Sequence, residues 1–237
     1  MAVEGQAASV PLMDFEELRL AFKGARSYLH GTDIFAGCLD LLATEGIVLR
    51  DIDMKLGRPS RSALRLVSVG NCTMQPAIAY LRGIHGSRLL ELKLVETDQV
   101  VSSRYQFDES DLLGDVTRVK SEVPTLQLVR TKRYRDIDLW ISMIKHALAN
   151  EVPGPDGQWL FGRIRIAKYE ESKTGSRHTI RAIAGLGTRN VRSSIQVDDT
   201  DLGMVDFVWS PRIEAQFATI RKFKHLKLTA TRCEEGR

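Results

Sequence analysis

The sequence predicts an α+β protein of two similar halves in tandem, each a short buried helix enclosed by a strongly curved antiparallel sheet. The first observation is an internal repeat, because residues 101–112 match residues 191–202 without a gap at Val, Ser, Gln, Asp and Leu positions. The second is a pair of short helices that are apolar on nearly every side and must therefore be buried. The third is the run of strands that follows each helix and supplies a sheet to bury it.

The first half is expected to begin with a strand over residues 18–28, followed by a helix over residues 33–43. Either Thr32 or Asp33 is the N-cap, and Gly46 lies just beyond the helix end, where glycine favours termination. Turn-forming Gly, Asn, Pro and Ser residues separate the strands that follow. These strands are predicted at residues 47–56, 63–69, 77–84, 89–96 and 100–107.

The second half repeats this plan. A strand over residues 125–134 precedes a helix over residues 138–148, and either Asp136 or Asp138 is the N-cap. Further strands are predicted at residues 159–169, 177–184, 191–197, 204–209 and 222–231.

The polar segment of residues 111–123 joins the two halves. We therefore predict a first unit over residues 14–116 and a second unit over residues 117–237. Residues 1–13 are expected to form a flexible arm, because they carry no periodic apolar pattern.

Composition is that of a globular protein, with 43% hydrophobic and 27% charged residues among 237. The net charge of +4 is mild, and 34 basic residues are scattered among 30 acidic ones, unlike the one-sided charge of a dedicated nucleic-acid binder. There is no signal-peptide pattern and no run near the ~20 apolar residues that a spanning helix needs. Three widely separated cysteines predict neither a disulfide framework nor a zinc site. We expect a soluble, cytoplasmic protein.

This order of elements over residues 18–209 resembles the double-hotdog members of the hotdog superfamily, in which two hotdog units are fused in one chain. The resemblance implies chemistry on an acyl thioester of coenzyme A or acyl carrier protein, with a pantetheine-bearing substrate and no required cofactor. It also implies that the site lies at the N-terminal end of a buried helix, where backbone N–H groups polarise the acyl carbonyl. Ile34 stands four residues after His30, where the dehydratase pattern has Gly, so a simple dehydratase is less expected.

The loops before the two helices supply the candidate catalytic residues. His30 is placed to lie beside Asp33, which would keep its pKa close to neutrality for proton transfer. Asp138 marks the rival site in the second half, and Tyr28 and Tyr134 occupy matching positions where a hydroxyl could face the thioester carbonyl. The alternatives are a structural loop histidine, helix-capping aspartates and tyrosines that pack at strand ends.

Basic residues near the second helix are candidates for binding the phosphates of coenzyme A or the acidic face of a carrier protein. They are Arg130, Lys132, Arg133 and Arg135. A second basic group at residues 221–227 is better interpreted as a solvated strand face. Clustered aspartates at residues 108–111 and 198–201 lack the spacing of a calcium loop and are interpreted as turns, so no metal site is predicted. Cys72 has no histidine at a partner spacing and is interpreted as unreactive.

Taken together, these features favour an enzyme that hydrolyses or transfers an acyl thioester in a fatty-acid-like or natural-product pathway. The alternative is a non-catalytic module that binds an acyl or lipid-like ligand or a protein partner. No nucleic-acid partner is expected, because aromatic residues are only 7% of the chain. No membrane partner is expected, and a homodimer is compatible with the sequence.

Overall fold

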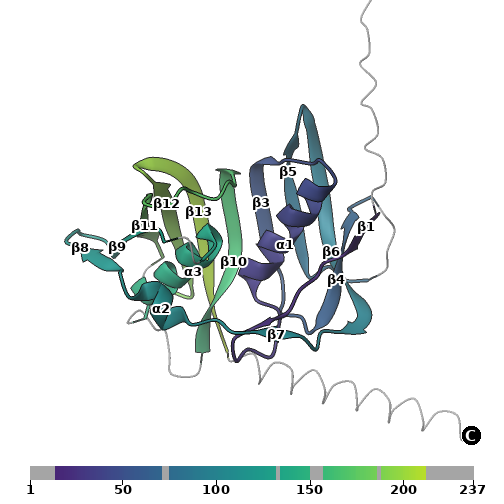
Figure 1. Ribbon diagram of the computed structural model, residues 1–237, viewed down its shortest axis with the longest axis horizontal. Helices are drawn as coiled ribbons and strands as arrows, with labels where there is room; N and C mark the ends of the chain where they lie inside the picture. Colours follow the sequence, from purple (N-terminus) through teal and green to yellow (C-terminus); the bar gives the residue numbers. More distant parts are fainter. Residues whose placement is uncertain (1–13, 71–74, 132–133, 150–156, 186–187, 212–237) are drawn as a thin grey trace, which may run out of the picture.

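One continuous antiparallel sheet of eleven strands organises the protein in the computed structural model, which describes residues 14–70, 75–131, 134–149, 157–185 and 188–211 (Figure 1). The strands, in sheet order, are β1 (Asp14–Glu17), β4 (Ser62–Ser68), β6 (Arg88–Val100), β5 (Ala79–His85), β3 (Arg50–Leu56), β10 (Gly157–Lys168), β13 (Thr200–Pro211), β12 (Asn190–Val197), β11 (Arg177–Ala184), β9 (Thr125–Val129) and β8 (Thr117–Val119).

Two main helices lie on the same face of this sheet. In Figure 1, α1 (Gly31–Thr44) lies over the first-half strands and α3 (Asp136–Ala147) over the second-half strands. Both are strongly apolar, and Phe35, Trp140 and Ile144 are completely buried. The prediction of one buried helix in each half is therefore confirmed.

The two halves join edge to edge through β3 and β10, each of which is the first strand after its helix. These strands pair antiparallel, with Met54 opposite Ile164, and both side chains are fully buried. Burial on both sides of the junction makes the core continuous from one half to the other. The sheet therefore does not break at the predicted boundary between units.

The halves share their element order but differ in how the inner strands are arranged. Toward the seam, the second half runs β9-β11-β12-β13-β10, with β8 as an additional edge strand beyond β9, and the first half runs β1-β4-β6-β5-β3. When strands are matched by their order after the helix, β5 corresponds to β12 and β6 to β13, and these two positions in the sheet are exchanged between the halves. In the second half β11, β12 and β13 pair in sequence order, whereas in the first half β6 lies between β4 and β5.

The repeat between residues 101–112 and 191–202 does not correspond to equivalent structure, so this part of the prediction is wrong. Residues 190–197 form β12, and positive φ angles at Asp198 and Asp199 close a tight turn into β13. In the first copy, Asp108 instead caps the short helix α2 (Glu109–Leu113) by accepting hydrogen bonds from the backbone N–H groups of Ser110 and Asp111. Similar aspartates thus serve two different local structures.

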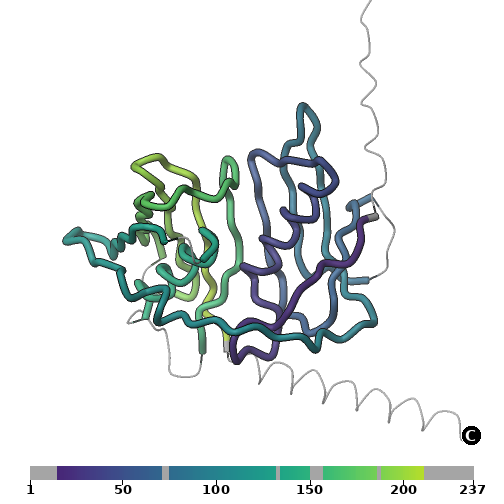
Figure 2. Tube along the Cα trace, viewed as in Figure 1, coloured from purple at the N-terminus to yellow at the C-terminus, as the bar shows by residue number. Residues whose placement is uncertain are grey.

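Two predicted strands are also largely wrong. The segment 18–28 contains only the two-residue strand β2 (Phe22–Lys23), and the segment 100–107 contains the last residue of β6 and the two-residue strand β7 (Arg104–Tyr105). These strands pair parallel with each other outside the main sheet. Figure 2 shows the chain after β6 crossing from the first half to the second, where α2 packs beside α3.

The predicted strand at 125–134 is observed only in its first half, as β9 (Thr125–Val129), and the other predicted strands within the described residues are confirmed to within a few residues. The predicted strand at 222–231 and the arm at 1–13 lie outside those residues. None of the helices in the described ranges has the length and apolar character needed to span a bilayer.

The β3–β10 junction gives a stability prediction. We expect Ile164→Ala to lower the free energy of unfolding by about 2–5 kcal/mol, because it leaves a cavity in a fully buried layer. Val100→Ala, at an exposed position on β6, is the control and should change stability by less than ~0.5 kcal/mol. Urea denaturation followed by circular dichroism measures both. Equal effects at the two positions would contradict a core that runs through the junction.

Candidate functional site

A cavity of about 230 Å³ opens at the N-terminal end of α1. Both halves line it: the start of α1 and the end of β3 come from the first, and the end of α3 with β10 and β13 from the second. Its walls are mostly apolar, with Ile34, Trp159 and Phe161 among them. Its polar side chains include His30 and Lys145.

Gly31 allows the first turn of α1 to approach the strands that line the cavity. A Cβ atom at this position would lie 2.6 Å from a methyl group of Leu56 and 2.7 Å from the ring of Phe161. Those distances are shorter than real side chains tolerate, so a larger residue would displace the cavity wall. The helix also starts two residues earlier than predicted, with His30 as the N-cap.

His30 and Lys145 form the polar edge of the cavity. The Nε2 atom of His30 lies 3.3 Å from the Lys145 amine, and its Nδ1 atom lies 2.8 Å from the hydroxyl of Thr32. Burial, followed by the charges of Lys145, Arg26 and Lys23, holds the pKa of His30 well below its usual value. Its imidazole is therefore neutral at neutral pH.

Burial also lowers the pKa of Lys145 to about 8, and the neighbouring Arg26 charge acts in the same direction. The Lys145 side chain therefore changes its protonation state close to physiological pH. A neutral imidazole next to an amine of this kind can accept, donate or relay a proton at the cavity.

Behind this edge, the buried Lys23 joins the starts of both helices. Its ammonium group donates to the hydroxyl of Thr32 at 3.1 Å and contacts the carboxylate of Asp138. The Asp33 carboxylate lies 3.9 Å away, and the ring of Phe107 lies below the ammonium group with its centroid at 3.9 Å. A single cation is thus shared between two carboxylates, a hydroxyl and an aromatic face.

The two carboxylates occupy matching places in the two halves. Asp33 is the third residue of α1 and Asp138 the third residue of α3. The hydroxyl of Tyr105 donates to Asp33 at 2.7 Å. Burial raises the pKa of Asp33, while the charge of Lys23 opposes that shift.

The structure brings together three of the predicted catalytic residues, His30, Asp33 and Asp138, but not as expected. His30 contacts Thr32 and Lys145 instead of Asp33, so the expectation that Asp33 keeps the pKa of His30 near neutrality is wrong. The cause is that helix α1 begins directly after His30, which directs the Asp33 side chain toward Lys23 and Tyr105.

The two tyrosines predicted at the site lie in different parts of the structure. Tyr28 lines the cavity. Tyr134 lies elsewhere, where its hydroxyl donates to Asp111 at 2.8 Å and its ring packs edge-on against Phe107. The matching sequence positions of these tyrosines therefore do not place them at matching sites.

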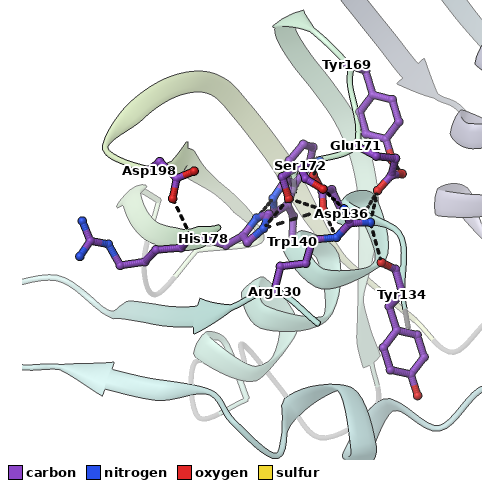
Figure 3. A network of polar contacts seen from close by, with 10 residues as sticks. Arg130, Tyr134, Asp136, Trp140, Tyr169, Glu171, Ser172, His178 and Asp198 are labelled. Carbon is purple, nitrogen blue, oxygen red and sulfur yellow. Dashed lines mark hydrogen bonds and ion pairs between the residues drawn. The ribbon is translucent and has the colours of Figure 1, made fainter. Parts of the chain in front are cut away.

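A second buried polar network surrounds the start of α3 (Figure 3). The indole N–H of Trp140 donates to Nδ1 of His178 at 2.9 Å, which leaves the Nε2 proton to be donated to the Ser172 hydroxyl at 3.0 Å. That hydroxyl in turn donates to Asp136 at 3.0 Å. The imidazole donates to the serine instead of accepting from it, so this Ser, His and Asp set does not activate a nucleophile.

The same network closes the N-terminal end of α3. The carboxylate of Glu171 accepts from the backbone N–H of Asp136 at 3.0 Å. The equivalent end of α1 faces the cavity instead. Arg130 pairs with Asp136 at 2.9 Å and with Glu171 at 2.7 Å. The α3 start is therefore filled by the chain's own side chains.

The basic residues predicted to bind phosphates have other places in the structure. Arg130 points into the network around α3, which differs from the expectation that it faces a ligand. Arg135, half exposed, pairs with Asp40 of α1 at 3.0 Å. Lys132, Arg133, the basic group at residues 221–227 and Cys72 lie outside the described residues.

Sequence reasoning missed Lys23, Tyr105 and Lys145, and it named Thr32 only as a candidate helix cap. Lys145 follows Asp138 by seven residues, so both lie on one face of α3. That spacing of charges on an otherwise apolar helix is a signal that could have found it. Lys23 carried no such signal, because its partners are distant in sequence. Within the described residues, no group of three or more His, Cys, Asp or Glu side chains is arranged to hold a metal ion.

No family model and no curated protein match the chain. Solved structures do match. A tesB protein of Mycobacterium avium subspecies paratuberculosis is 12% identical, covering 78% of this chain and 88% of that one with a TM-score of 0.40. A Lactobacillus plantarum protein assigned as an oleoyl thioesterase is 12% identical, covering 84% and 96% with a TM-score of 0.44.

The dehydratase domain of PpsC from Mycobacterium tuberculosis, solved in complex with C12:1-CoA, is 11% identical. It covers 77% of this chain and 85% of that one, with a TM-score of 0.44. The three structures are thus described as a tesB protein, an oleoyl thioesterase and a dehydratase domain.

Removal of the Lys23 ammonium group should destabilise the protein. We expect Lys23→Met to cost about 3–5 kcal/mol in unfolding free energy, because it leaves the carboxylates of Asp33 and Asp138 without their shared cation. Adding Asp138→Asn should recover part of the loss, and the exposed Lys55→Met is the control. Denaturant titration of the wild type, Lys55→Met, Lys23→Met, Asp138→Asn and the double variant measures this, and strictly additive effects of the two single changes would contradict the pairing.

The His178 network predicts a pH dependence. Burial lowers the pKa of His178 to about 4, whereas an unfolded histidine titrates near ~6.5. The unfolded chain then binds more protons, so the contribution of this group to stability is lost as pH falls from about 6.5 toward 4. We expect His178→Gln to flatten the slope of unfolding free energy against pH there by up to ~1.4 kcal/mol per pH unit.

Thermal and urea unfolding between pH 4.5 and 7.5 measures that slope. His85→Gln, at the end of β5, provides the matched histidine control. Parallel curves for the wild type and His178→Gln would show that the buried imidazole is not held neutral.

Proposed function

We propose that the protein is an enzyme that acts on an acyl thioester of coenzyme A or acyl carrier protein, by hydrolysis or acyl transfer. The observation that carries the proposal is the pair of His30 and Lys145 at the edge of an apolar cavity, directly at the N-terminal end of α1. An apolar pocket with a few convergent polar groups and perturbed pKa values is the usual form of an active site.

The α1 start supplies the electrophilic component. Charge develops on the carbonyl oxygen as a thioester is attacked, and backbone N–H groups at a helix N-terminus stabilise it. The acyl chain lies against Ile34, Trp159 and Phe161, which exclude water from the reacting bond. The start of α3 has no such role, because Glu171 already accepts from its first N–H group.

Lys145, with His30 beside it, supplies proton transfer. Above its pKa of about 8 the Lys145 amine accepts a proton from water as the oxygen attacks the carbonyl carbon. The carbon–sulfur bond then breaks, and the leaving thiolate receives that proton to give the free thiol and a carboxylic acid. His30 orients the amine through its Nε2 atom. Asp33 and Asp138 act as positioning residues through Lys23.

We further propose that the two halves are fused hotdog units, as the sequence resemblance implies. The antiparallel pairing of β3 with β10, each the first strand after its helix, supports a twofold-like relation between the halves. The matching positions of Asp33 and Asp138 on either side of Lys23 support it as well.

A binding module without chemistry is the second candidate. It is favoured by one observation: among the described residues that line the cavity there is no carboxylate, and Asp33 and Asp138 are engaged with Lys23 behind it. A cavity of this kind can hold an acyl ligand without turning it over.

Thiol release from hexanoyl-coenzyme A tests the enzyme. After subtraction of the spontaneous rate, we expect the rate to rise as pH increases through about 8, because the Lys145 amine becomes deprotonated there. Lys145→Arg keeps the charge at all these pH values and should remove the rise, and His30→Gln should lower kcat by about 10²-fold. Lys55→Met should behave as the wild type.

A pH profile that is identical in the wild type and Lys145→Arg would overturn the role of Lys145. Tight retention of the thioester with no thiol released over hours would favour the binding module instead.

A further inference from the structure

The cavity at the α1 start has an uncompensated positive charge. Among the described residues that line it, the charged side chains are Arg58 and Lys145, and none is acidic. Arg58 is satisfied by Glu96, whose two carboxylate oxygens accept from its guanidinium at 3.1 and 2.7 Å. The charge that remains belongs to Lys145.

Lys145 has no carboxylate at ion-pair distance within the described part of the chain. Its amine contacts His30 on α1 at 3.3 Å. The other charged groups that act on it are Arg26 before α1, Lys23 on β2, Glu109 on α2 and Asp138 on its own helix. The two cations repel the Lys145 ammonium group, and the two carboxylates lie beyond ion-pair distance of it.

Ammonium groups withdrawn from water are usually paired with an anion, and Lys145 is partly buried. Here two features at the same place favour an anion: the Lys145 ammonium and the N-terminal end of α1, a helix of fourteen residues. The rest of the cavity is apolar. A ligand that complements these features has a negatively charged head group and a small apolar body.

We propose that this cavity is a binding site for a small organic carboxylate, with its carboxylate at Lys145 and the α1 start and its hydrocarbon part against Trp159 and Phe161. A volume of about 230 Å³ corresponds to seven or eight water molecules at ~30 Å³ each, which limits the ligand to about that number of non-hydrogen atoms. Hexanoate is of that size.

This inference goes beyond the proposed function, because it requires no turnover. A carboxylic acid is what hydrolysis of a thioester leaves behind, but the site binds it equally in an enzyme and in a binding module. Failure to release thiol would therefore leave the inference standing, and only equilibrium binding tests it.

Isothermal titration calorimetry with the full chain at pH 7 makes the comparison, using hexanoate and its uncharged analogue hexanamide. We expect hexanoate to bind at least about ten-fold more tightly, since its head group meets a charged donor in a desolvated site. Lys145→Met should remove that preference. Lys145→Arg should retain it, and Lys55→Met should match the wild type.

A second measurement varies the pH. Raising the pH to 9.5 discharges a lysine whose pKa is about 8, so the preference for hexanoate should fall in the wild type and persist in Lys145→Arg. Equal affinity for hexanoate and hexanamide at pH 7 would overturn the proposal, as would a preference that survives in Lys145→Met.

Discussion

The buried ammonium group of Lys23 is the interaction on which the arrangement of the two halves depends. It lies on the two-residue strand β2, outside the main sheet, and reaches the first turns of both long helices through Thr32, Asp33 and Asp138. A buried cation with several partners fixes geometry more than it adds stability, because its desolvation offsets much of the attraction. Its effect is to hold the start of α1 against α3, which places His30 beside Lys145 at the cavity.

The edge-to-edge joining of β3 and β10 complements this interaction. It makes one sheet and one core from two similar sets of elements, so the cavity wall can draw on β3 from one half and β10 and β13 from the other. The exchanged inner strands of the first half leave this junction untouched, because both β3 and β10 keep the position next to the seam. Sheet layout can therefore vary between the halves while the geometry around the cavity is kept.

Periodic apolar patterns were sufficient to predict both buried helices and most strands, because burial imposes those patterns directly. They failed for residues 18–28 and 100–107, where the chain is held by a short parallel pair and by side-chain contacts that leave no period. The site was predictable only in part. His30, Asp33 and Asp138 were indicated by their places before and within the helix starts, but the partners that decide their chemistry lie far away in sequence. Lys23 and Asp138 are 115 positions apart, as are His30 and Lys145, and no local rule connects them.

The two helix starts have different surroundings, and Glu171 accounts for that difference. Its side chain occupies the end of α3, together with Arg130 and Ser172, while the corresponding end of α1 faces open space. Within the described residues, the start of α1 therefore opens on a cavity while the start of α3 is closed by side chains. A ligand held at the start of α1 should accordingly combine with the protein in a one-to-one ratio.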